Sequence, residues 1–199
     1  MNKYLNTLLL LPLLIIGQLH VKPAADVVNY YGTPTDIIFN NTKFTLTWSS
    51  HPNDTYYKQE YITHGDAVEH FKDMVLVDFI ITDLTVKDAA QAQVNNILER
   101  KKTDKVCNYQ IIKNEQTGEY ILDFIMSEST GDDLSVIEWS GYHYKPYTDK
   151  AGHKGVLLFG ISHRAYGDDT MNFLKTLKTY RGDVLKALVA YQVPEIQIQ

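Results

Sequence analysis

The chain has 199 residues, 44% of them apolar and 22% charged, which is the composition of an ordinary globular protein. Its 24 acidic residues outnumber its 19 lysines and arginines, and no basic stripe exists that could release counterions from a polyanion. The charge balance therefore excludes nucleic acid and anionic membranes as expected partners.

The N-terminal segment predicts export. In "MNKYLNTLLLLPLLIIG", Lys3 precedes an apolar run from Leu8 to Gly17, the layout of a secretory signal peptide. The run is shorter than the roughly 20 apolar residues of a membrane span. We expect residues 1–17 to be the signal peptide, with cleavage as late as residue 25, and an uncleaved anchor as the alternative. A bacterial protein that is periplasmic or secreted, without stable membrane insertion after cleavage, follows from this interpretation.

The first structured segments are an extended lead-in and a hairpin. Residues 18–42 are polar and turn-prone, and they are expected to end in a short strand at 37–39. Phe44, Leu46 and Trp48 then alternate with threonines, the period of a half-buried strand. Because the turn sequence "HPND" follows and "TYYKQEYI" comes after it, residues 43–62 are predicted to form a hairpin.

A stretch of concentrated polar residues comes next, "EYITHGDAVEHFKDMVLVDF" at 60–79. His64 and His70 are six residues apart and would not share a helix face, so they make a poor zinc site. We expect Gly65 to allow a turn, and Asp66 to cap one or two helical turns that reach Met74. The stretch is thus interpreted as a polar corner that faces water, with no metal.

The clearest helix is predicted for Val86 to Lys101, where small and apolar residues recur at helical spacing. Thr85 is its expected N-cap, and Asp88 stands where a capping box needs a carboxylate. Two hairpins around "NEQTG" and "TDKAGH" should follow, and a second helix should begin near Asp169. Cys107, the only cysteine, is expected to be a buried inert thiol, with an intermolecular disulfide as the alternative.

This order of elements predicts a single α+β domain at 43–192, an antiparallel sheet with two main helices packed on it. The pattern "YI-x-x-G-x-x-V-E-x-F-x-x-M", with the elements that follow it, resembles exported bacterial proteins of the Mog1/PsbP-like type. The resemblance covers roughly residues 43–191 and implies an α/β/α sandwich used for accessory or protein-binding work. It brings no catalytic motif.

Aromatic side chains in "EWSGYHYKPY" are the candidate binding residues: Trp139, Tyr142, Tyr144 and Tyr147. Such rings can stack on a sugar or a peptide, and the alternative is that they belong to the core and the sheet surface. Three histidines at ten-residue intervals, His143, His153 and His163, are expected to act separately.

The sequence holds no G-x-S-x-G elbow, P-loop, dinucleotide fingerprint or H-E-x-x-H. We therefore expect an exported accessory or protein-interaction protein without catalytic activity, metal or cofactor, and with another protein as its partner. One alternative is a binder of a small or extended ligand, a sugar or a peptide. The other is a hydrolase assembled from dispersed residues such as Ser135, Glu138 and His163.

Overall fold

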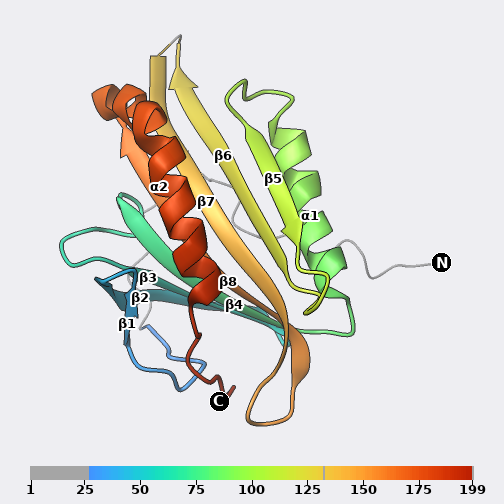
Figure 1. Cartoon of the computed structure of the whole chain (residues 1–199). Coiled ribbons are helices and arrows are strands. Elements are labelled where there is room, and N and C mark those ends of the chain that lie inside the picture. Colours follow the sequence, from blue (N-terminus) through green and yellow to red (C-terminus); the bar gives the residue numbers. More distant parts are fainter. Residues whose placement is uncertain (1–26, 132, 199) are drawn as a thin grey trace.

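One antiparallel sheet of eight strands forms most of the protein (Figure 1). The computed structural model describes residues 27–131 and 133–198, so the predicted signal peptide lies outside the described residues. The strands are β1 (Asp36–Phe39), β2 (Thr42–Asn53), β3 (Tyr56–Ile62), β4 (Asp73–Ile81), β5 (Asn108–Lys113), β6 (Tyr120–Thr130), β7 (Asp133–Thr148) and β8 (Lys154–Tyr166). They lie in the order β1-β2-β3-β4-β8-β7-β6-β5.

The helices are α1 (Val86–Arg100), a short 3-10 helix η1 (Gly167–Asp169) and α2 (Thr170–Ala190). Strands make up 47% of the described residues and helices 23%, so the expected α+β layout, an α/β/α sandwich of Mog1/PsbP-like type, is wrong. The fold is dominated by its sheet, because consecutive strands are joined mostly by hairpins and β7 alone has 16 residues. Neither α1 nor α2 is long and apolar enough to cross a membrane.

Helix α1 forms as the sequence predicts. The Thr85 side chain accepts from the Asp88 backbone, and the Asp88 carboxylate accepts from the Thr85 N–H, which completes the capping box. Ala90 and Val94 are buried against strands β6 and β7, whereas Leu98 is 43% exposed. The small buried residues let the helix lie close to the sheet.

Helix α2 covers the other face of the sheet. Phe173, Val184 and Leu188 are buried there among side chains of β4, β7 and β8. Two irregular segments complete this cover, because Tyr31 and Ile196 are also buried in the same cluster. The lead-in that was expected to stay extended therefore contributes to the core from Tyr31 onward, and the C-terminal tail does so beyond residue 192.

The polar corner is not helical. Residues 66–72 form turns with an isolated bridge between Ala67 and His70, and β4 already begins at Asp73. Phe71 and Met74 are buried with Ile62 in a small cluster of their own. Their burial needs no helical turn, so the expectation of one or two turns here is wrong.

The hairpin turns are confirmed, with positive φ at Gly118 and Gly152.

Candidate functional site

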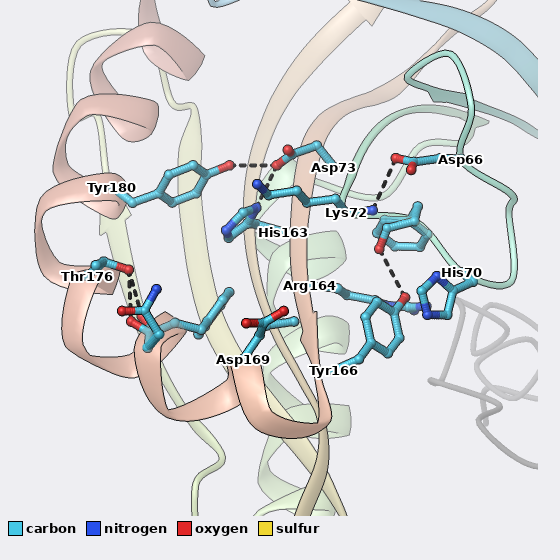
Figure 2. Close-up of a pocket in the computed structure, with 14 residues that line it drawn as sticks. Asp66, His70, Lys72, Asp73, His163, Arg164, Tyr166, Asp169, Thr176 and Tyr180 are labelled. Carbon is cyan, nitrogen blue, oxygen red and sulfur yellow. Dashed lines mark hydrogen bonds and ion pairs between the residues drawn. The ribbon is translucent and has the colours of Figure 1, made fainter.

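A hollow of about 580 Å³ lies between the start of β4, the end of β8 and the first half of α2 (Figure 2). We call it the β4–α2 hollow. The residues that line it are Asp66, His70, Phe71, Lys72, Asp73, His163, Arg164, Ala165, Tyr166, Asp169, Asn172, Phe173, Thr176 and Tyr180. Its size is within the range of small-molecule sites, and many of its lining groups form hydrogen bonds.

An aspartate, a histidine and a tyrosine that bond or stack on one another form part of the wall of this hollow (Figure 2). Asp73 Oδ1 lies 2.7 Å from His163 Nδ1 and 2.9 Å from Tyr180 Oη. Because an ionised carboxylate only accepts, both neighbours donate to it, so the imidazole carries a proton on Nδ1. The ring of His163 stacks on Tyr180 at 4.1 Å and on Phe173 at 5.1 Å between ring centroids. The imidazole is thereby fixed by contacts to both the sheet and α2.

Strand register brings the pair together. Asp73 is opposite His163 in the β4–β8 ladder, although 90 residues separate them along the chain. Each residue was visible in the sequence, Asp73 in the polar corner and His163 among the spaced histidines. The only sequence signal that could have joined them is the pairing of β4 with β8, which the order of elements does not give.

The rest of the polar corner holds its own loop in place. The Asp66 carboxylate accepts from Thr63 Oγ1 at 2.7 Å and from the Lys72 backbone at 3.2 Å. His70 stacks on Tyr166 at 4.0 Å between ring centroids. The corner therefore does more than face water, because it forms one side of the hollow. In residues 27–131 and 133–198, no three His, Cys, Asp or Glu side chains are grouped to hold a metal ion.

The three dispersed hydrolase candidates are not brought together. Glu138 lies on the opposite face of the sheet from His163, where it pairs with Arg164 and accepts from Ser140 Oγ. Ser135 occupies a bulge of β7, between the residues that pair with Glu128 and Ser129. Within the described part of the chain, no hydroxyl or thiol hydrogen-bonds to the His163 ring. The arrangement supplies a fixed imidazole without a nucleophile on it.

The four predicted binding aromatics do not share one surface. Trp139 points to the α2 side of the sheet and Tyr142 and Tyr144 to the α1 side, and all three are buried. Tyr147 is half-buried at the end of β7. Three of the four therefore belong to the core, which was the alternative for them, and a part for any of the four in binding stays a prediction.

The remaining spaced histidines and the cysteine lie apart from the hollow. His143 pairs with Glu119 and His153 with Asp149, each at a separate place on the sheet. Cys107 is buried, and burial raises the pKa of its thiol to about 11. The thiol is thus protonated at neutral pH, which agrees with the predicted inert cysteine because only the thiolate is a nucleophile.

Tyr144 offers a test of the packing on the α1 side. Its hydroxyl is buried and has no hydrogen-bond partner in the described part of the chain, so Tyr144→Phe should leave the free energy of unfolding unchanged or raise it by about 1 kcal/mol. Tyr31→Phe is the matched control, because the Tyr31 hydroxyl donates to Tyr57 O and accepts from Phe79 N. Urea denaturation should show that only the control loses stability, by about 1–3 kcal/mol. A comparable loss in both would mean that the Tyr144 hydroxyl is bonded.

Glu60 predicts a dependence of stability on pH. Burial raises the pKa of this carboxyl to about 7, against 4.5 in an unfolded chain. The contribution of Glu60 to the free energy of unfolding is therefore fully present below pH 4.5 and is lost as pH rises through 7. The reason is that the folded state keeps a proton that the unfolded state has already released. The loss amounts to about 3 kcal/mol.

Glu60→Gln removes this titration. Urea denaturation at several pH values should show the stability of the variant rising relative to the parent between pH 4.5 and pH 8, by up to about 3 kcal/mol. Parallel curves for the two proteins across this range would show that Glu60 is not buried as an uncompensated acid.

No curated protein matches the sequence. A protein family of uncharacterised function matches residues 31–193, which include every strand, both helices and all lining residues of the β4–α2 hollow. Nothing in the match connects the chain with Mog1/PsbP-like proteins, so that resemblance stays a prediction. The chain belongs to this uncharacterised family.

Proposed function

We propose that the protein is a binding protein without catalytic activity, and that the β4–α2 hollow holds its ligand, a small polar molecule. The observation that carries the proposal is the hollow itself, about 580 Å³ in volume, with His163 fixed in its wall by Asp73 and Tyr180. Binding sites typically hold a few polar groups in place on rigid elements, as this sheet and helix do.

Binding is favoured over hydrolysis by what surrounds His163. A general base needs a nucleophile or a bound water on its free nitrogen, and no hydroxyl or thiol of the described residues is bonded there. Thr176, the hydroxyl on the facing helix, donates instead to the Asn172 and Phe173 carbonyl oxygens. The protein partner expected from the sequence stays a prediction beside this proposal.

Export is part of the proposal and rests on residues 1–17. A ligand binder with a signal peptide would act in the periplasm or outside the cell. Intact-mass analysis of protein from the export compartment should give a chain cleaved before residue 27, and a full-length mass there would favour the uncleaved anchor.

A blocking variant tests the site. Asn172 lines the hollow and is exposed on α2, so Asn172→Trp should fill the hollow without disturbing the core. Lys178→Trp is the matched control, since Lys178 is exposed on the same helix outside the lining. Both variants should keep the melting temperature of the parent.

The measurement is an NMR titration with amino acids, dipeptides, dicarboxylates and monosaccharides at millimolar concentrations. We expect one class to shift the signals of His163 and Tyr180 in the parent and in Lys178→Trp, and to lose at least tenfold in affinity in Asn172→Trp. The proposal fails if no class binds, or if Asn172→Trp binds as well as the parent does.

A further inference from the structure

Two charged side chains of the β4–α2 hollow have neither an ionic nor a hydrogen-bond partner in residues 27–131 and 133–198: Lys72, just before β4, and Asp169, the last residue of η1. The other charged groups of the wall are already bonded. The Asp66 carboxylate accepts from Thr63 Oγ1 and the Lys72 N–H, and the Asp73 carboxylate accepts from His163 and Tyr180. The Arg164 guanidinium is paired with Glu138. The hollow therefore offers a ligand one available ammonium and one available carboxylate.

These two groups lie on different sides of the histidine. Figure 2 shows the Lys72 side chain extending toward Tyr180 above His163, while Asp169 lies below it at the start of α2. Neutral donors and acceptors are present on α2, where Asn172 and Thr176 line the hollow. The available ammonium and the available carboxylate are thus separated by the imidazole.

We infer that the ligand is a short peptide with both ends free, with its carboxylate near Lys72 and its ammonium near Asp169. This inference rests on the proposed function, since it names the ligand class of the same site. A ligand with only anionic groups would face Asp169, and one with only cationic groups would face Lys72, so each would lose on one side what it gains on the other.

The available volume favours a peptide over a single amino acid. A second hollow of about 440 Å³ runs along α2, and it shares His163, Phe173, Thr176 and Tyr180 with the first. The two hollows adjoin at these residues. Backbone amides of a peptide would find hydrogen-bonding groups at His163 and Thr176, while its side chains extend along the helix.

Three probes of nearly equal size separate the two ends. L-alanyl-L-alanine carries both charges, its N-acetyl form lacks the ammonium, and its C-terminal amide lacks the carboxylate. By isothermal titration calorimetry we expect the unblocked dipeptide to bind tightest, and each blocked form to bind about three- to tenfold more weakly. This range takes into account that Lys72 and Asp169 are exposed to solvent.

Two variants should change the preference among the three probes in opposite ways, which a merely structural effect cannot reproduce. Lys72→Met should bind the dipeptide and its amide equally while still discriminating against the N-acetyl form. Asp169→Asn should bind the dipeptide and the N-acetyl form equally while still discriminating against the amide. Both side chains are exposed, so both variants should fold.

The outcomes are distinguishable from a failure of the proposed function. If the parent binds the three probes equally, or binds dicarboxylates better than the dipeptide, the ligand class is wrong while the site stands. If no probe of any class binds and Asn172→Trp changes nothing, both proposals fail. Equal losses for all three probes in both variants would also overturn the assignment of the two ends.

Discussion

Val94→Asp should destabilise the protein by several kcal/mol or prevent its folding. Val94 is buried between α1 and the sheet, and the nearest side chains of its cluster are apolar. An unpaired carboxylate there would lose its hydration without gaining a partner. Ala90→Glu should behave in the same way, because Ala90 has no exposed surface and a longer side chain would also overpack the interface.

Asn95→Asp is the control for this prediction. Asn95 is the next residue of the helix, is exposed, and accepts from Gln91 through an oxygen that an aspartate also provides. The control adds the same charge at nearly the same point along α1. Urea denaturation should place it within about 0.5 kcal/mol of the parent. If Val94→Asp and Asn95→Asp unfold at the same urea concentration, α1 is not packed on the sheet.

Trp139→Ala should lose about 3–5 kcal/mol of stability, the usual result of removing a large buried aromatic side chain. Trp139 is 1% exposed, donates from Nε1 to Asp123 Oδ1 and meets the Tyr180 ring edge-on at 5.8 Å. Because Tyr180 also donates to Asp73, the change should loosen the wall of the β4–α2 hollow as well as the core.

Trp48→Ala gives the comparison for a tryptophan outside the core. Trp48 is 37% exposed, and its ring lies under Lys58 Nζ at 5.5 Å. Its loss should cost about 1 kcal/mol or little more, since only a partly exposed cation–π contact and part of the ring burial are removed. Thermal denaturation of both variants provides the test. Equal losses would contradict the placement of Trp139 in the core.

Local signals in the sequence predict most of the elements. Helix α1 is confirmed from Val86 with its capping box, because apolar spacing over fifteen residues and the pair Thr85 and Asp88 agree. The hairpins are confirmed because turn residues separate alternating strands. The prediction of helical turns at 66–74 was wrong because so short a segment can fit a helical period by chance. Phe71 and Met74 are buried there without a helix.

Tertiary features were missed for two physical reasons. The Asp73–His163 pair depends on β4 lying beside β8, which is a long-range pairing that local patterns do not contain. The sequence did hold a clue to the placement of the candidate aromatics. Side chains alternate across a strand, so Trp139 and Tyr142, an odd and an even position, had to lie on opposite faces of β7.

The proportion of strand to helix could not be predicted from the order of the elements alone. The same order of strands and two helices fits an α+β layout and a sheet-dominated fold equally well. The difference lies in strand length, 16 residues in β7 and 13 in β8, and in the irregular segments that cover the sheet where helices do not. No clear end of those long strands is visible in the sequence, since their alternation continues through polar residues.

The most direct test of the binding site is a crystal structure of the protein grown with L-alanyl-L-alanine. We expect electron density for the dipeptide in the β4–α2 hollow, with its carboxylate within hydrogen-bond distance of Lys72 Nζ and its ammonium toward Asp169. Density for the dipeptide at any other place, or a hollow that holds only water at saturating dipeptide, would contradict the account.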